Sequence, residues 1–241
     1  MKNIVCMKWG TKFGANYVNA LYKMVEKNIT GEFRFICFTE NSDGIDKNVE
    51  IMPLPQMNID ENAPERGWRK ISMMSEKLGD IEGQALFLDL DIVILRNIDE
   101  FFDVDGEFVI IKDWDFPEAV TGNSSVFRFE VGKHQDVLDY FVNNTEEVAK
   151  NFRNEQAYLS DAMYKKGVLS YWDKKWCVSF KRHCLQKFPM NYFKEPKCPE
   201  DAKILIFHGR PTPEQAINGY WGKMGFRYVK PTTWINDYRI I

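Results

Sequence analysis

The sequence of 241 residues predicts one α/β domain built on a mixed, mainly parallel central sheet. In the first half of the chain, short apolar segments alternate with segments of helical spacing. Strands that are separated by helices generally pair in parallel through right-handed crossovers. No internal repeat, low-complexity run or linker-like stretch divides the chain, which is long enough to bury a substantial core. We therefore expect a single domain over residues 1–241.

Strand and helix signals follow one another in the first half. Residues 3–8 and 33–40 are short and apolar, as buried strands are, and residues 14–28 between them place Tyr17 and Leu21 on one helical face. The other predicted elements of this half are a strand or extended segment over 49–55 that its prolines end, a helix over 67–78, and a strand that starts near residue 84.

The second half is less regular. Residues 108–114 and 124–131 have the composition of strands, and the second is a candidate antiparallel strand. Helical spacing covers residues 134–152 and 154–166. A last clear strand is predicted over 203–209, and the prolines of 211–220 are typical of a helix start.

The composition excludes several classes of protein. A net charge of −3 gives no reason to expect nucleic acid as a partner. No apolar run approaches the roughly 20 residues that span a bilayer, and the first residues lack the apolar core of a signal peptide. Five cysteines without a C-x-x-C pair argue against a disulfide framework and a zinc ribbon. We expect a cytoplasmic protein without a transmembrane segment.

Two aspartates interrupt the apolar stretch "LFLDLDIVIL". Asp89 and Asp91 are expected in the later part of the strand, where alternation points both side chains to one side. Two such carboxylates repel each other unless a cation lies beside them, and Mg²⁺ or Mn²⁺ accepts carboxylates together with phosphate oxygens. The alternative is that one aspartate caps a turn while the other faces solvent.

A histidine ends the late strand in "ILIFHGRPTP". His208 is a candidate imidazole ligand for Mn²⁺, and Arg210 is a candidate phosphate contact. The alternative for a lone histidine is a hydrogen bond to a loop carbonyl. The pairing with Asp89 and Asp91 favours the metal interpretation.

The segments "LFLDLDIVIL" and "IFHG", in this order, resemble the GT-A glycosyltransferases, especially the family 8-like enzymes and related bacterial capsule and lipopolysaccharide transferases. The order of segments is similar over nearly the whole chain. The resemblance implies a GT-A fold with a D-x-D motif and a Mn²⁺ or Mg²⁺ cofactor. It also implies a nucleotide-diphosphate sugar donor, with a UDP-sugar favoured, and a glycan or other hydroxyl acceptor.

The same resemblance implies roles for individual residues near the metal. Asp91 corresponds to the second aspartate of the motif, which holds the metal, and Asp89 to the first, which contacts the metal or the donor ribose. His208 corresponds to the third protein ligand. In "RNEQAYLS", Glu155 and Gln156 would lie beside the reacting anomeric carbon, although acidic residues are also common at a helix N-terminus.

Further residues are implied for donor binding. One of Arg66, Arg69 and Lys70 would carry the basic group near the donor sugar or phosphate, since a charged run at a helix start is otherwise solvated. Asn123 and Ser124 in "TGNSSVFRF" are candidates for sugar contacts, with a polar turn before a strand as the alternative.

The chain departs from the family in two places. The usual ending H-F-x-G-x-x-K-P-W is replaced by "FHGRPTPEQA". Arg210 is therefore the candidate that takes the place of the phosphate-binding lysine. The N-terminal strand lacks the usual acid–Tyr signature, and Lys8, Trp9, Phe13 and Tyr17 are instead candidates that stack on or border a uracil.

The stereochemistry stays open. A retaining reaction requires no strong base, and Gln156 or Glu155 would lie near the anomeric centre. An inverting reaction needs a carboxylate that deprotonates the acceptor hydroxyl, for which Glu155, Asp113 and Asp115 are candidates.

A basic and aromatic stretch over 179–193 has no clear periodicity. It is either a basic acceptor loop, an ordinary surface segment or a place of peripheral membrane contact. His183, Cys177 and Cys184 lack zinc-ligand spacing.

Two other functions compete with sugar transfer. A sugar-nucleotide pyrophosphorylase also uses metal-bound carboxylates, but "MKWGTKFG" lacks its glycine-rich phosphate loop. A non-catalytic relative that binds sugar nucleotides is the other alternative, against which the complete Asp/Asp/His set argues.

Overall fold

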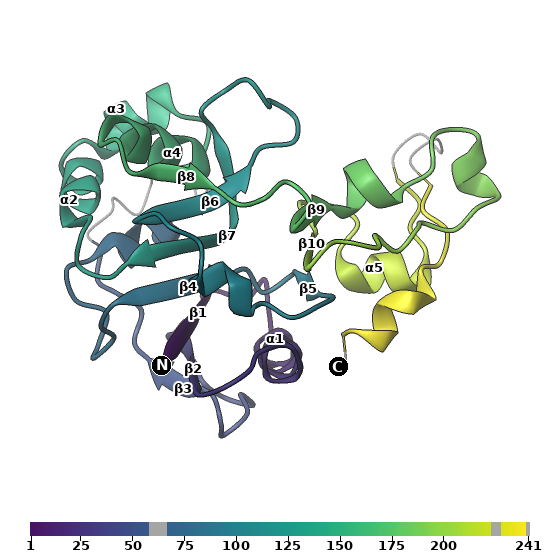
Figure 1. The fold of residues 1–241 in the computed structure, drawn as a ribbon, viewed down its shortest axis with the longest axis horizontal. Coiled ribbons are helices and arrows are strands. Elements are labelled where there is room, and N and C mark those ends of the chain that lie inside the picture. Colours follow the sequence, from purple (N-terminus) through teal and green to yellow (C-terminus); the bar gives the residue numbers. More distant parts are fainter. Residues whose placement is uncertain (58–66, 223–227, 240–241) are drawn as a thin grey trace.

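A computed structural model of the chain describes residues 1–57, 67–222 and 228–239. In Figure 1 a large sheet with flanking helices lies on the left, and a smaller region with a second sheet lies on the right. The large sheet has seven strands. In sheet order they are β3 (Glu50–Met52), β2 (Phe33–Thr39), β1 (Lys2–Lys8), β4 (Gln84–Leu88), β7 (Gly122–Glu130), β6 (Phe108–Lys112) and β8 (Leu169–Tyr171).

The large sheet is mixed and mostly parallel, as predicted. Strand β1 pairs in parallel with β2 and β4, β2 pairs in parallel with β3, and β6 with β8. Only β7 runs antiparallel to its neighbours β4 and β6 among the strands described. The fold class expected from the alternating first half is therefore confirmed.

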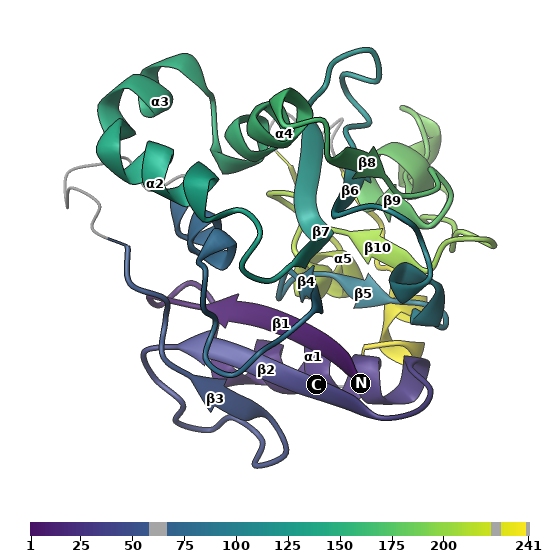
Figure 2. The same cartoon turned by 60° about the vertical axis from the view of Figure 1, so that its left-hand side comes forward.

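Alternation along the strands divides the core between the two faces of the sheet. On β1, Ile4 and Cys6 pack toward helix α1 (Ala15–Asn28), whereas Val5 and Met7 pack toward the opposite face. Figure 2 shows helices α2 (Gln135–Asn143), α3 (Thr145–Asn151) and α4 (Glu155–Lys165) together on that opposite face.

Two predicted helices differ in detail from the structure. The single helix expected over 134–152 is broken at Asn144 into α2 and α3, since Asn144 leaves the helical conformation. The helix expected over 67–78 is a shorter 3-10 helix, Trp68–Met74. This 3-10 helix buries nearly all of its side chains. The spacing of its apolar residues therefore does not mark one buried face of a longer α-helix.

The second sheet joins distant parts of the chain. It consists of β5 (Val93–Ile94), β10 (Ile204–Ile206) and β9 (Cys177–Ser179), with β10 in the middle. Strand β10 runs antiparallel to β5 and parallel to β9. One hydrophobic cluster extends from α1 through β5 and β10, so the core is continuous between the two sheets.

Helix α5 (Pro213–Asn218) follows the second sheet and begins as its prolines predict. Pro213 occupies the first turn. Thr212 and Gln215 form a reciprocal capping box, which satisfies two backbone donors of that turn.

The strand predicted through Asp89 and Asp91 is wrong beyond Leu88. Strand β4 ends at Leu88, and the backbone of Asp89 makes one more bond, from its N–H to the carbonyl of Ser125 at 2.9 Å. Both aspartates then lie in a turn, because the chain leaves the large sheet there to enter the second one as β5. A turn, and not the alternation of a strand, therefore brings the side chains of Asp89 and Asp91 to the same cavity.

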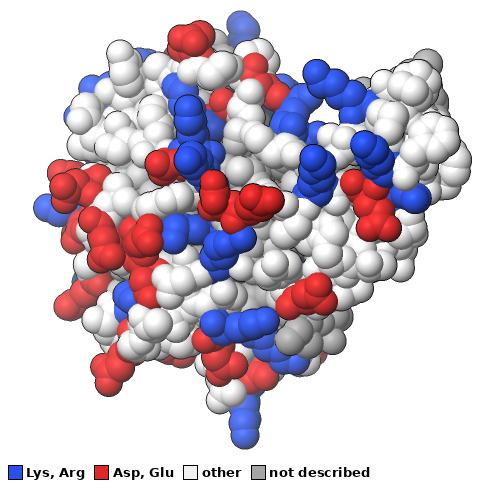
Figure 3. All heavy atoms as spheres, turned by 45° about the vertical axis from the view of Figure 1, so that its right-hand side comes forward, with Lys and Arg blue, Asp and Glu red and all other residues white. Residues whose placement is uncertain are grey.

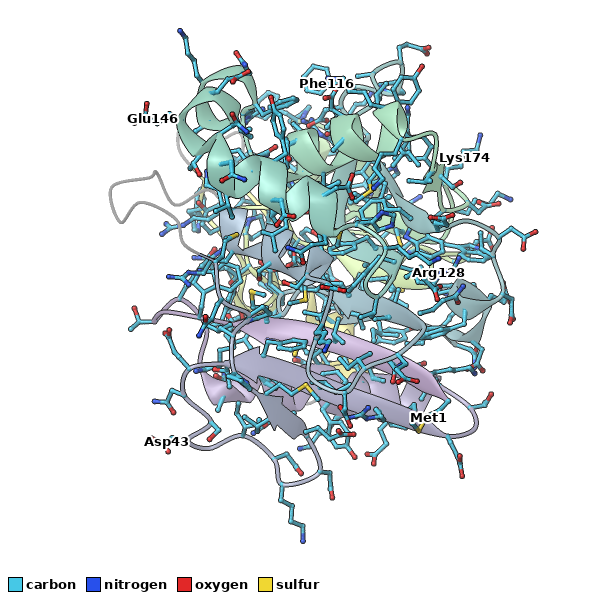
Figure 4. The ribbon with its side chains drawn as sticks, turned by 90° about the vertical axis from the view of Figure 1, so that its left-hand side faces the viewer. Met1, Asp43, Phe116, Arg128, Glu146 and Lys174 are labelled. Carbon is cyan, nitrogen blue, oxygen red and sulfur yellow. The ribbon has the colours of Figure 1, made fainter. Side chains whose placement is uncertain are left out.

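A buried arginine supports the large sheet away from this turn. Arg128 on β7 is fully buried, and its guanidinium donates hydrogen bonds to the carbonyls of Phe101, Val104 and Gly106 (Figure 4). Across the described ranges 1–57, 67–222 and 228–239, the structure has no helix of sufficient length and apolar character for a membrane span.

Candidate active site

A cavity of about 550 Å³ opens where β1 and β4 end and where β7 and α4 begin. In open α/β sheets, ligands bind outside the carboxyl ends of parallel strands, and β1 and β4 are such a pair. The residues after β10 complete the wall. Ten of the residues that the sequence singled out line this cavity: Trp9, Phe13, Lys70, Asp89, Asp91, Asn123, Ser124, Glu155, Gln156 and His208.

The pairing of β5 with β10 explains why His208 lies opposite the two aspartates. Asp91 lies two residues before β5, and His208 lies two residues after β10. Because the strands are antiparallel, with Val93 opposite Leu205, the start of one lies beside the end of the other.

A buried charge network forms the floor of the cavity. The Lys70 ammonium lies 2.7 Å from an Asp89 carboxylate oxygen and 3.8 Å from a Glu155 carboxylate oxygen. The hydroxyl of Ser124 donates to Glu155 at 2.6 Å. Lys70 and Glu155 are both buried, so their charges are held in place by each other and not by solvent.

The network changes the ionisation of its members. Burial alone would lower the pKa of Lys70, but the carboxylates of Asp89 and Glu155 outweigh it and raise the pKa above its ordinary value. Lys70 is therefore charged at neutral pH. Burial, and then repulsion by Asp89, raise the pKa of Asp91 to about 7.

Gln156 lies on the wall beside the network because of how α4 begins. The side chain of Asn154 caps the helix by accepting a hydrogen bond from the N–H of Ala157 at 3.2 Å. This places Gln156 in the first turn, where its amide oxygen accepts from the backbone N–H of Ser124 at 3.4 Å. Strand β7 thus orients the amide at the cavity.

His208 is held by the second sheet and by the loop after β6. Its Nε2 lies 2.7 Å from the hydroxyl of Ser179, and its ring stacks on Trp114 with centroids 5.8 Å apart. Lys181 donates a hydrogen bond to the carbonyl of His208. Burial, and then the charge of Lys181, lower the pKa of His208, so its imidazole is neutral at neutral pH.

The three expected metal ligands share the cavity but are not assembled into a cluster. Among the described residues, no group of three or more His, Cys, Asp or Glu side chains is arranged to hold a metal ion. Asp89 is paired with Lys70, and His208 with Ser179. Two carboxylates and a neutral imidazole are nevertheless ligands that Mn²⁺ accepts, so the donor set fits this ion by its chemistry.

Several predicted donor-binding residues lie elsewhere. Lys8 is buried and donates to the carbonyl of Asn41 at 3.0 Å. The hydroxyl of Tyr17 donates to Glu214 at 2.6 Å. Arg69 and Arg210 are exposed outside the cavity, and Arg66 lies outside the described residues.

Burial distinguishes the basic residues that precede the two aspartates. Lys70 points inward from the 3-10 helix to Asp89, while its neighbour Arg69 faces solvent. Of the two described candidates, the structure therefore brings only Lys70 to the cavity.

Asp113, a candidate base, faces a different cavity. It lines a second cavity of about 560 Å³ together with Trp114 and Trp172. Its carboxylate accepts a hydrogen bond from the backbone N–H of Asp115 at 2.7 Å, and Asp115 in turn pairs with Arg182.

Sequence reasoning missed part of the cavity wall. Thr11 and Lys12, in the loop after β1, line the cavity, as do Ser125 and Asn154. The Lys12 ammonium lies 4.6 Å from the centre of the Phe13 ring. The signal for Lys12 was its place in the loop directly after the first parallel strand, where ligands bind.

Comparison with known proteins identifies the fold. No family model and no curated protein matches the sequence. Among solved structures, the galactosyltransferase LgtC, in complex with donor and acceptor sugar analogues, has a TM-score of 0.59 at 15% identity. That match covers 92% of this chain and 90% of LgtC.

Two longer proteins are also similar. The glycosyltransferase GlyE of Streptococcus pneumoniae TIGR4 has a TM-score of 0.60 at 13% identity, covering 93% of this chain and 58% of GlyE. The bifunctional glycosyltransferase WbbM has a TM-score of 0.58 at 12% identity, covering 88% of this chain and 46% of WbbM. The chain spans about half the length of these two proteins. The chain has the GT-A glycosyltransferase fold, with its cavity at the carboxyl ends of the parallel strands.

Proposed function

We propose that the chain is a metal-dependent glycosyltransferase. It would move a sugar from a nucleotide-diphosphate sugar, with a UDP-sugar favoured, to a glycan or other hydroxyl acceptor. The observation that carries the proposal is the cavity itself: the buried network of Lys70, Asp89 and Glu155 lies in the wall that also presents Asp91 and His208. The solved structures of similar fold support the same class of reaction.

Asp89, Asp91 and His208 would hold a Mn²⁺ or Mg²⁺ ion. When bound, this ion supplies positive charge against the negative charge that develops on the departing nucleoside diphosphate. Lys70 holds the carboxylate of Asp89 in a fixed orientation through their 2.7 Å contact. Lys12 lies at the cavity opening, where a cation favours a diphosphate.

The N-terminus of α4 would face the reacting sugar. The amide of Gln156 is oriented by the backbone of Ser124, and the carboxylate of Glu155 is engaged by Lys70 and by the Ser124 hydroxyl. Both contacts are made by the same oxygen, Oε1, so the Glu155 carboxylate is anchored in the network and not directed freely into the cavity. This favours Gln156 as the side chain beside the anomeric carbon and Glu155 as the group that positions the network.

The aromatic residues of the loop after β1 would border the nucleotide base. Trp9 and Phe13 both line the cavity. Base rings stack on aromatic side chains without a demand for sequence-specific hydrogen bonds, which suits a nucleoside at this position.

The test is a screen of sugar nucleotides for slow, metal-dependent hydrolysis, combined with thermal unfolding in UDP. We expect UDP to raise the melting temperature with Mn²⁺ but not in EDTA, and Asp91→Asn to remove the increase. Asp43→Asn, which changes an exposed aspartate that does not line the cavity, is the matched control and should retain the increase.

Three results would overturn parts of the proposal. Equal stabilisation by UDP in EDTA would exclude the metal role of the three ligands. Release of pyrophosphate from UTP and a sugar 1-phosphate would favour the pyrophosphorylase alternative. Metal-dependent UDP binding without hydrolysis or transfer of any sugar nucleotide would favour a non-catalytic relative.

A further inference from the structure

The smaller region of the molecule exposes a set of large apolar side chains. Phe188, Phe193 and Trp221 are 66%, 70% and 69% exposed, and Met190 is 40% exposed. A soluble domain rarely leaves several such side chains together in water without a use for them. Together with Tyr192 and Tyr228, whose rings contact Phe188 or Trp221, we call this set the aromatic patch.

Ring contacts join four members of the aromatic patch, and Met190 and Phe193 are the neighbours of this group in the chain. Tyr192 stacks on Tyr228 with centroids 5.2 Å apart, and Trp221 lies 4.4 Å from Tyr228. Phe188 and Trp221 each meet Tyr192 at 6.2 Å. The 3-10 helix Met190–Tyr192 carries the centre of the patch, and Figure 1 places this segment at the right-hand end of the molecule.

Lysines border the aromatic patch. Lys187, Lys194 and Lys197 are exposed within the same segment, where Glu195 is the one carboxylate, and Lys230 donates to the carbonyl of Phe193 at 3.3 Å. The chain as a whole carries a net charge of −3, so the positive net charge of this segment is opposite in sign to that of the chain. In Figure 3, Lys and Arg side chains lie along the border of the uncharged surface at the upper right.

The basic stretch at residues 180–188 is not itself this surface. Phe180 is fully buried, Lys181 donates to the carbonyl of His208, and Arg182 pairs with Asp115 at 2.7 Å. The first half of the stretch therefore serves the cavity. Only from Lys187 onward do the basic and aromatic side chains face solvent together.

We propose that the aromatic patch docks on the interface of a membrane that contains anionic lipids. Aromatic side chains are favoured at the level of the headgroups, where their rings are partly desolvated. Lysines at the border attract anionic headgroups, and the two contributions together give a stable but reversible attachment. The inference does not depend on the donor site, because none of these residues lines that cavity.

A second copy of the chain is a less suitable occupant. A two-fold contact through the aromatic patch would bring the bordering lysines of both copies toward one another, since such contacts use the same surface twice. An anionic bilayer has the opposite charge, so the lysines favour it.

Co-sedimentation of the full chain with vesicles tests the proposal. We expect binding to vesicles of phosphatidylcholine with about one third phosphatidylglycerol, and much weaker binding to phosphatidylcholine alone. The variant F188S/F193S/W221S should lose binding, by roughly tenfold or more for each aromatic removed. The variant K187Q/K194Q should lose about fivefold per lysine, and high salt should have a similar effect on the unchanged chain.

Matched controls separate docking from folding. Y140S/Y164S removes two aromatics that are 50% and 60% exposed on α2 and α4, and K133Q/K150Q removes two exposed lysines, one before α2 and one on α3. Both controls should bind vesicles like the unchanged chain. Hydrolysis of a sugar nucleotide without vesicles should be unchanged in all four variants, so that a failure of the donor site is seen separately.

Two results would overturn the proposal. One is absence of binding by the unchanged chain, or equal binding by the aromatic variant. The other is a concentration-dependent dimer in light scattering that W221S abolishes, without vesicle binding, which would assign the aromatic patch to a second copy.

Discussion

The two sides of the cavity are built in different ways. On the side of the seven-stranded sheet, Lys70, Asp89, Glu155 and Ser124 already contact one another and are largely buried. On the side of the three-stranded sheet, His208 contacts Ser179 and Trp114 and faces the aspartates across the cavity. The charged groups of the first side are thus already in place, whereas His208 on the second side would have to exchange its contact with Ser179 to bind the proposed metal ion.

The largest expected effect is on the preorganised side. Lys70→Met would leave Asp89 and Glu155 without their cation in a buried place, so we expect a loss of about 3–5 kcal/mol in the free energy of unfolding. Urea unfolding measures it. Arg69→Met, one residue away and exposed, should change the free energy by no more than about 0.5 kcal/mol. Similar values for both variants would mean that the network does not stabilise the fold.

A smaller effect is expected where the two sides meet. Trp114→Ala would remove the ring that stacks on His208, so the imidazole would lose its orientation. Groups that orient a metal ligand typically change metal affinity by about 10–100-fold, and we expect a loss of Mn²⁺ affinity in this range. Titration of Mn²⁺ into the UDP complex measures it, and Trp114→Phe should recover part of the loss. Unchanged affinity in the alanine variant would separate Trp114 from the site.

The smallest expected effect is on the free energy of unfolding at acidic pH. His134 is buried, and neither ring nitrogen has a hydrogen-bond partner among the residues described. Burial, and then the charge of Lys166, lower its pKa. Its neutral form therefore stabilises the fold fully above about pH 6.5, the usual pKa of histidine. This contribution is lost as the pH falls toward the lower pKa of the folded state.

His134→Phe should remove this acid sensitivity. Between pH 7 and pH 5, the free energy of unfolding should fall by about 1 kcal/mol more in the unchanged chain than in the variant. Urea unfolding at the two pH values gives the difference. Equal losses would show that other groups account for the acid sensitivity.

The sequence predicted the charged half of the site best. Asp89 and Asp91 were identified because two carboxylates in an apolar stretch are conspicuous, and Glu155 and Gln156 because "RNEQAYLS" resembles a helix start of the glycosyltransferase family. All four line the cavity. His208 was identified for the same reason at the end of a strand.

The errors have physical causes. Lys8 and Tyr17 are near the cavity in sequence, but the former is buried at the end of β1 and the latter faces Glu214 on α5. Strands of two or three residues, such as β5, β8 and β9, carry too few residues for a period to be detected. The turn at Asp89 was hidden because the residues on both sides of it are buried and apolar.

The pairing of β5 with β10 also decides when the site can exist. Val93 and Leu205 face each other across about 110 residues of intervening chain, and contacts at such separation form slowly because a long loop must close first. During synthesis, the aspartates leave the ribosome well before the strand that positions His208. The cavity is thus among the last parts of the molecule to be completed, and a truncated chain that lacks β10 would retain Lys70 and Asp89 without the wall that carries His208.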